Sequence, residues 1–196
     1  MTTTPTAAIA EPTLQAGPDL APLYRAVRDV PDFPKPGILF KDIMPLLADA
    51  DCLRLAIDAF AARCRALASE NGVEINKIVG IDARGFLFGA AVAYALGLGF
   101  IPVRKKGKLP GRTETLAYAL EYGEAVVEMH TDALRPGDRV VLIDDLLATG
   151  GTAAAALRLI EKLGGQPLGV LFLIELEFLG GRAKLAPVLT EALLKY

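Results

Sequence analysis

The chain has 196 residues, of which 53% are hydrophobic, and its formal net charge is −2. This length allows one domain with a substantial core, and the weak negative charge argues against a nucleic-acid-binding protein, which usually shows a basic face. Two cysteines and one histidine argue against a metal site built from these residue types.

The N-terminal segment, residues 1–20, is rich in Thr, Ala and Pro, and the first basic residue is Arg25. It has neither the basic start nor the continuous apolar stretch of a secretory signal. We therefore expect a disordered tail followed by a single domain over residues 21–196. Within that domain we expect a helix near residues 20–27 and a proline-rich loop over residues 31–36.

An amphipathic helix is predicted from about Asp51 to Leu67, because apolar residues recur there at helical spacing. Cys52 and Cys64 both lie on this helix and are expected to be small core residues rather than a disulfide pair. His130 has no partner that suggests nucleophilic or metal chemistry, so we expect it on the surface of a strand.

Short apolar runs predict the strands of the core, at residues 77–81, 100–103, 140–143 and 168–174. The first three runs each lead into a polar or glycine-rich loop, a pattern typical of a parallel sheet with right-handed helical crossovers. Residues 115–122 and 125–130 are predicted to form a hairpin around Gly123 and Glu124.

The stretch from Gly85 to Val103 carries no charge and is long enough to resemble a membrane span. Gly97, Gly99 and Pro102 interrupt it, which favours a buried helix ending at Leu96 and then a short strand. We therefore expect no membrane segment.

The most informative run is residues 140–152, where a buried strand leads to Asp144 and Asp145 and then to a glycine-rich turn. Adjacent carboxylates at a strand end can accept hydrogen bonds from a vicinal diol. The turn Thr149–Thr152, with a helix after it, can offer backbone N–H groups to a phosphate. Taken singly, paired acids can also cap a helix and paired glycines can also turn a chain. Their order after a buried strand favours a phosphorylated sugar.

This run resembles the 5-phosphoribosyl 1-pyrophosphate (PRPP) signature of type I phosphoribosyltransferases. Four more segments, residues 33–43, 82–86, 104–111 and 120–123, are similar in the same order to adenine-using members of that family. The resemblance covers nearly everything after residue 20. It implies an α/β fold with a parallel-sheet core flanked by helices, a small hood at about residues 30–45, and a flexible lid hairpin at about residues 104–123.

The resemblance also implies which residues bind PRPP. They are Arg84, Gly85, Arg104, Lys108, Asp144, Asp145, Ala148, Thr149, Gly150, Gly151 and Thr152. Arg84 would hold the pyrophosphate by charge-assisted hydrogen bonds, although taken alone it could equally be a solvated turn residue. The crowded charges of Arg104 to Lys108 would be relieved by a polyanion, and Lys105 and Lys106 are expected to face water. Relatives imply that Arg104 or Lys108 can act across a dimer interface.

The catalytic residues implied are Glu121, Tyr122, Asp144 and Asp145. In relatives the matching glutamate handles the proton or orients the base, and the tyrosine contacts the leaving group. The two aspartates would stabilise positive charge on the ribose. Adenine would be bound by Leu39, Phe40 and Lys41, with the phenyl ring stacked on the purine and backbone groups at its edge.

The function we expect is transfer of the 5-phosphoribosyl group from PRPP to adenine, giving AMP and pyrophosphate, with Mg2+ held mainly by PRPP and water. The resemblance further implies a cytoplasmic homodimer whose partners are these small molecules, with neither nucleic acid nor membrane. Three alternatives stay open: transfer to hypoxanthine, guanine or xanthine; a PRPP-binding regulator without turnover; and a nucleotide-binding redox or methyl-transfer domain. The last is disfavoured because no G-x-G-x-x-G or G-x-x-x-x-G-K-[ST] motif is present.

Overall fold

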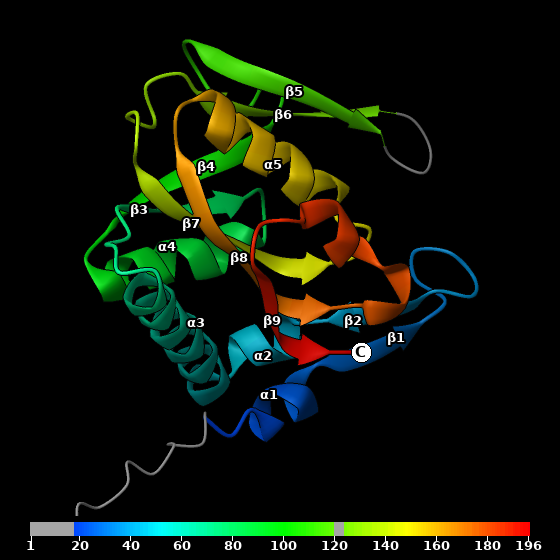
Figure 1. Ribbon diagram of the computed structural model, residues 1–196. Helices are drawn as coiled ribbons and strands as arrows, with labels where there is room; N and C mark the ends of the chain where they lie inside the picture. Colours follow the sequence, from blue (N-terminus) through cyan, green and yellow to red (C-terminus); the bar gives the residue numbers. More distant parts are fainter. Residues whose placement is uncertain (1–17, 120–123) are drawn as a thin grey trace, which may run out of the picture.

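A computed structural model describes residues 18–119 and 124–196. Its centre is a seven-stranded sheet in the order β5-β6-β4-β3-β7-β8-β9 (Figure 1). The neighbours from β4 to β9 are parallel, whereas β6 runs antiparallel to both β4 and β5. The strands are β3 (Lys77–Ile81), β4 (Gly99–Lys105), β5 (Thr113–Ala119), β6 (Glu124–His130), β7 (Arg139–Leu147), β8 (Gln166–Glu175) and β9 (Thr190–Lys195). The predicted parallel α/β core is therefore confirmed.

Helices cover both faces of this sheet, as Figure 1 shows, with α3 (Ala50–Glu70) and α4 (Gly85–Leu96) on one side and α5 (Gly151–Lys162) on the other. The α3/α4 side packs around Phe60 and Phe88, whose ring centroids are 5.8 Å apart. The α5 side packs Ile160 against strand residues such as Phe172. Each face of the sheet therefore has its own apolar core, as expected for strands that are apolar on both sides.

The helix predictions hold in both long helices of the α3/α4 side. Asp49 caps α3 by accepting hydrogen bonds from the N–H groups of Asp51 and Cys52. Cys52 and Cys64 are both free and buried on α3, which confirms them as core residues. The charge-free helix α4 ends at Leu96 as predicted. No helix within residues 18–119 and 124–196 is both long and apolar enough to cross a membrane.

A small two-stranded unit stands apart from the main sheet, near the segment expected to form the hood. It pairs β1 (Arg28–Pro31) with β2 (Leu39–Asp42) in antiparallel register, and α1 (Ala21–Ala26) and α2 (Met44–Ala48) flank it along the chain. The sequence analysis did not predict these two strands, because they are short and lack an apolar run. β1 is mostly exposed, whereas β2 is mostly half-buried. The chain's C-terminal end lies beside them (Figure 1).

Strand β7 is longer than predicted. The apolar pattern ends at Ile143, but the hydrogen-bonded ladder with β8 continues to Leu147 opposite Glu175. Asp144 and Asp145 therefore lie within the strand and not after it, which corrects the expected boundary. The ladder with β3 does stop at Ile143, so the two acids lie where β7 keeps one neighbour and loses the other.

The hairpin prediction is confirmed over the described residues, since β5 and β6 pair from Thr113 opposite His130 to Ala119 opposite Glu124. His130 lies half-buried on β6, in the strand expected for it. The predicted N-terminal tail falls on residues 1–17, outside the described residues, except for its last three positions.

Candidate active site

The fork between β3 and β7 is the place where the sheet changes its winding direction. From β3 the chain passes through α4 on one face to β4, and from β7 it passes through α5 on the other face to β8. In open α/β sheets, ligands bind beyond the carboxyl ends of strands at such a switch point, because the diverging connections leave a crevice there.

Two adjoining cavities occupy this position. The larger, of about 610 Å3, is lined by residues from the ends of β3, β4 and β7 and from β5 and β6, including Asp82, Arg84, Arg104, Lys105, Tyr118, Asp144, Asp145 and Thr152. The smaller, of about 90 Å3, is enclosed by the turn from Leu147 to Ala153 together with Asp144, Leu146 and Phe172. Both cavities share Asp144, Leu146 and Thr152. A ligand with two anionic ends can therefore occupy them together.

Of the two acids at the fork, Asp145 is buried and Asp144 is half-buried, and both can accept hydrogen bonds. Asp144 Oδ1 accepts the N–H of Asp145 at 2.9 Å. Arg84 Nε lies 2.7 Å from Asp145 Oδ2, but the pair does not form an aligned hydrogen bond. This buried oxygen has no hydrogen-bond partner among the described residues. Since buried polar atoms normally have partners, Asp145 Oδ2 is an acceptor available to a ligand.

Burial raises the pKa of Asp144 well above its ordinary value, and the neighbouring charge of Asp145 raises it further. Burial also raises the pKa of Asp145, while the Arg84 guanidinium lowers it in part. Two adjacent carboxylates that are largely removed from water destabilise a fold unless something compensates their charges. Their presence at a cavity therefore indicates a functional constraint rather than a structural one.

The turn Ala148–Thr152 joins β7 to α5 and forms the wall of the smaller cavity. Gly150 adopts a positive φ of 76° as the residue that caps α5, and none of the described side chains caps the helix at that position. The first N–H groups of a helix lack internal partners and carry the positive end of its dipole. This turn can therefore hold an anion, as predicted from Thr149 to Thr152.

The turn after β3 lies directly against β7. Its Asp82–Ala83 peptide bond is cis. At Gly85, an added Cβ atom would lie only 2.7 Å from Asp144 Oδ1 and 2.9 Å from the Ile143 carbonyl oxygen. Only glycine allows this approach, which places Arg84 beside the acids.

The basic segment at the end of β4 is held by hydrogen bonds. Arg104 Nε donates to Asp82 Oδ2 at 3.1 Å, and Arg104 Nη1 donates to the Lys108 carbonyl oxygen at 3.1 Å. Arg104 thus connects the turn after β3 to the loop after β4. Lys105, expected only to face water, lines the larger cavity, and Lys108 is not among its lining residues.

One residue that the sequence analysis missed is Glu128, which is only 3% exposed on β6. Its Oε1 atom accepts the backbone N–H groups of Lys108 and Leu109, each at 2.8 Å, and Oε2 accepts the Thr113 hydroxyl at 3.3 Å. Burial alone would raise the pKa of Glu128, but these backbone donors bring it below its ordinary value. Glu128 therefore shapes the loop that follows Arg104. The sequence feature that could have indicated Glu128 is a carboxylate between two apolar residues, Val127 and Met129.

The segment expected to bind adenine lies on β2. The Phe40 ring centroid is 5.8 Å from the Arg84 guanidinium carbon, which places this ring on the Arg84 side of the site. Lys41 Nζ pairs with Asp29 at 2.6 Å, so its side chain is engaged within the β1–β2 unit. Leu39 is half-exposed.

Two predicted catalytic residues, Glu121 and Tyr122, lie outside the described residues. The β5–β6 hairpin contacts the turn Ala148–Thr152, since the Tyr118 hydroxyl on β5 lies 3.0 Å from Thr152 Oγ1. No group of three or more His, Cys, Asp or Glu side chains able to hold a metal ion occurs among residues 18–119 and 124–196.

The chain is similar to known proteins over most of its length. The pattern of the phosphoribosyl transferase domain matches residues 53–184. The adenine phosphoribosyltransferase of Acidothermus cellulolyticus is 52% identical over 178 residues, covering 90% of this chain and 97% of that protein. The crystal structure of the adenine phosphoribosyltransferase of Thermoanaerobacter pseudethanolicus superposes with a TM-score of 0.83 at 47% identity, over 90% of this chain and 99% of that one. The Saccharomyces cerevisiae adenine phosphoribosyltransferase, complexed with adenine and an imino-altritol bisphosphate, gives a TM-score of 0.82 at 43% identity, over 86% of this chain and 94% of that one.

Proposed function

The chain belongs to the adenine phosphoribosyltransferases of the phosphoribosyl transferase domain family, and on this premise we propose that it transfers the 5-phosphoribosyl group of PRPP to adenine. The products are AMP and pyrophosphate, and the reaction serves purine salvage. The observation that carries the proposal is the placement of two adjacent acids, one buried and one half-buried, beside a turn that can hold an anion at the switch point of the sheet.

The sugar and its phosphate fit the two adjoining cavities. The 5-phosphate would lie in the smaller cavity, against the backbone N–H groups of Thr149 to Thr152. The 2- and 3-hydroxyls would then reach Asp144 and Asp145, where Asp145 Oδ2 is ion-paired with Arg84 but accepts no hydrogen bond from the described residues. This assignment gives each end of the ribose phosphate a complementary group.

The pyrophosphate end would face the basic side of the larger cavity. Arg84 and Arg104 both line it, and each now pairs with an aspartate. A polyanion can share these guanidinium groups, because each one has five N–H donors. Lys108 would act from the neighbouring loop.

The acids have a second role once the bond to pyrophosphate breaks. Positive charge then develops on the ribose, as in glycoside cleavage, and adjacent carboxylates in a low-dielectric site stabilise that charge. Attack of the base on the face opposite the leaving group inverts the sugar carbon.

The described residues offer few ligands for Mg2+ at this site. Three described carboxylates line the larger cavity, Asp82, Asp144 and Asp145, and Asp82 pairs with Arg104. We therefore propose that Mg2+ is held mainly by PRPP and water, with Asp144 and Asp145 close by. When bound, the ion offsets negative charge on the leaving pyrophosphate.

Adenine as the base is supported by the names of the relatives and by the adenine in the yeast complex. We propose that Phe40 stacks on the purine and that backbone groups of Leu39 and Lys41 contact its edge. Glu121 and Tyr122 remain predictions for proton handling and leaving-group contact. A homodimer and a cytoplasmic location also remain predictions.

A base panel tests this function. Purified protein, Mg2+ and labelled PRPP are incubated with adenine, hypoxanthine, guanine or xanthine, and the nucleotides are separated by chromatography. We expect AMP as the main product. As a control, Asp145→Asn should lower turnover by about a hundredfold or more, a typical loss for one preorganised electrostatic contact. A main product other than AMP would refute the base assignment, and turnover near wild type in Asp145→Asn would refute the role of the acid.

A further inference from the structure

The phosphate turn is supported from behind by a segment from the C-terminal part of the chain. This segment contains two short 3-10 helices, Glu177–Leu179 and Gly181–Leu185, between β8 and β9. A Cβ atom added to Gly181 would collide with the Ala148 carbonyl oxygen and lie 2.9 Å from Gly150 N. A Cβ atom added to Gly150 would lie 2.5 Å from the Gly181 carbonyl oxygen. The two backbones are therefore in direct contact, with no room for a side chain.

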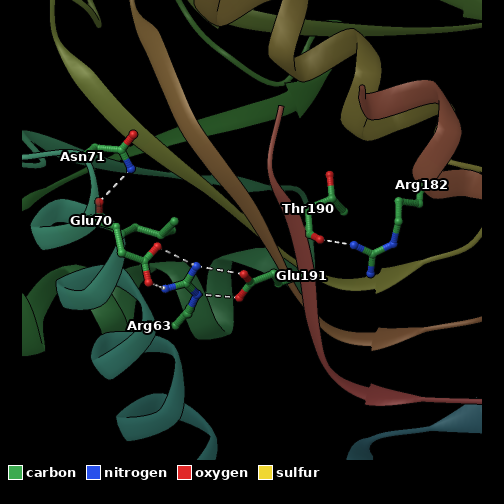
Figure 2. Close-up of polar contacts among 7 residues, drawn as sticks. Arg63, Glu70, Asn71, Arg182, Thr190 and Glu191 are labelled. Atoms are coloured by element: carbon green, nitrogen blue, oxygen red, sulfur yellow. Dashed lines mark hydrogen bonds and ion pairs between the residues drawn. The ribbon is translucent and has the colours of Figure 1, made fainter. Parts of the chain in front are cut away.

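Arg182, the next residue, anchors this segment to the sheet. Its guanidinium group pairs with both carboxylate oxygens of Glu175, with Nε 3.0 Å from Oε1. Its Nη1 atom also donates to the Thr190 carbonyl oxygen, the contact that Figure 2 shows. Glu175 is 4% exposed at the end of β8, and Thr190 begins β9. A single side chain thus connects the ends of two strands to the residue beside Gly181.

Neither Gly181 nor Arg182 lines the two cavities at the fork. Any effect of these residues on a ligand must therefore pass through the turn Ala148–Thr152. Such a turn needs outside support, because its glycines allow many backbone conformations and a binding site must hold its donors within about 0.5 Å of their working positions.

We propose that Gly181 and Arg182 are positioning residues for the 5-phosphate site. The Arg182–Glu175 clamp holds the Gly181 backbone against Ala148 and Gly150, so that the N–H groups of the turn converge on the phosphate. This inference rests on the proposed function, since it assigns the turn to the 5-phosphate of PRPP.

The variants for the test are Gly181→Ala, which pushes on the turn, and Arg182→Met, which removes the clamp but keeps much of the side-chain volume. Arg182→Lys keeps the charge but loses the two-pronged contact with Glu175. Two changes serve as matched controls. At Gly99 an added Cβ atom would meet only the Lys77 side chain at 3.7 Å, so Gly99→Ala is tolerated. Arg54→Met removes an exposed arginine on α3.

The measurements are the KM for PRPP, the KM for adenine, kcat, and the Kd of ribose 5-phosphate and of pyrophosphate by calorimetry. We expect Gly181→Ala and Arg182→Met to raise the KM for PRPP and the Kd of ribose 5-phosphate by about tenfold or more, because displacements near 1 Å cost factors of this order. The Kd of pyrophosphate and the KM for adenine should change by less than about twofold, since those groups bind elsewhere. Arg182→Lys should lie between Arg182→Met and wild type.

The possible outcomes distinguish a positioning role from a purely structural role and from failure of the proposed function. Variants that melt earlier but keep the wild-type Kd for ribose 5-phosphate would show that the segment only stabilises the fold, and the inference would be wrong. Equal weakening of ribose 5-phosphate and pyrophosphate would also overturn it. If Arg182→Met does not fold, Gly181→Ala and Arg182→Lys decide by the same comparison. If the wild type binds ribose 5-phosphate but forms no AMP, the proposed function fails, while selective loss of that binding in the variants would still support the positioning role.

Discussion

Asp144 belongs to the site but lowers the stability of the folded state. Burial and the charge of Asp145 raise its pKa, so the folded state binds a proton at Asp144 more tightly than the unfolded state does. The free energy of unfolding therefore falls as the pH rises above the ordinary value of 3.8, until the folded-state pKa is passed.

We predict that Asp144→Asn increases stability and abolishes most activity. The amide oxygen can still accept the N–H of Asp145, while the buried charge is removed. Urea unfolding of both proteins at about pH 4 and pH 8 checks this, with a larger gain expected at pH 8, where wild-type Asp144 carries more charge. A variant less stable than wild type at pH 8 would mean that the acid pair is well compensated in the free protein.

Glu128 illustrates the opposite case, a buried carboxylate that the fold needs. Backbone donors lower its pKa despite burial, so its contribution to stability is present above its ordinary pKa of 4.5 and is lost as the pH falls through the lower folded-state value. We predict that Glu128→Met lowers the free energy of unfolding by about 2–4 kcal/mol at pH 7, because the backbone N–H groups of Lys108 and Leu109 lose their buried acceptor.

The matched control is Glu128→Gln, which retains an oxygen for both N–H groups. It should lose less than half as much stability in the same urea titrations. Equal losses in the two variants would show that the charge, rather than the hydrogen-bond geometry, stabilises the loop.

At the scale of elements, α3 and β9 are joined by one arginine. Arg63 donates to Glu191 on β9 at 2.5 Å and to Glu70 on its own helix at 2.7 Å, and Figure 2 shows the two carboxylates on either side of the guanidinium group. Hydrogen bonding to Glu191 raises the pKa of Arg63. The contact fixes the last strand of the sheet against the longest helix.

We predict that Arg63→Met lowers the free energy of unfolding by about 1–2 kcal/mol, the range for charge-assisted hydrogen bonds that are mostly screened from water. The KM for PRPP should stay unchanged, because Arg63 pairs with Glu191 and Glu70 and not with the turn Ala148–Thr152 or with Gly181 and Arg182, which support that turn. Arg54→Met, on the exposed side of the same helix, should change stability by less than about 0.5 kcal/mol. Similar losses in the two variants would show that the contact with Glu191 contributes nothing specific.

The elements predicted from the sequence are those whose buried side chains form a recognisable apolar pattern. β3 was predicted over its full length, because each of its residues after Lys77 is buried and apolar or glycine. β1 and β2 were missed, because their stability comes from pairing within a small exposed unit that carries no apolar run. The end of β7 was placed too early, because polar side chains interrupt the apolar pattern while the backbone ladder with β8 continues.

At the scale of the whole molecule, the site follows from topology. Asp144 and the turn at Gly150 were predicted from a local motif and Arg84 from the family resemblance, and the switch point between β3 and β7 places all three at one opening. Glu128 and Arg182 could not be predicted in the same way. Glu128 and one of the Arg182 contacts use backbone groups, so their role depends on the folded path of the chain and not on a pattern of side chains.

The central claim is that PRPP lies across the fork, with its 5-phosphate on the turn after β7 and its ribose on the two acids. A crystal structure of the protein with Mg2+ and PRPP tests this most directly. We expect phosphate oxygens within hydrogen-bond distance of the N–H groups of Thr149 to Thr152, and ribose hydroxyls within the same distance of Asp144 and Asp145. Density for PRPP at another place, or at the fork with the acids turned away from the sugar, would contradict it.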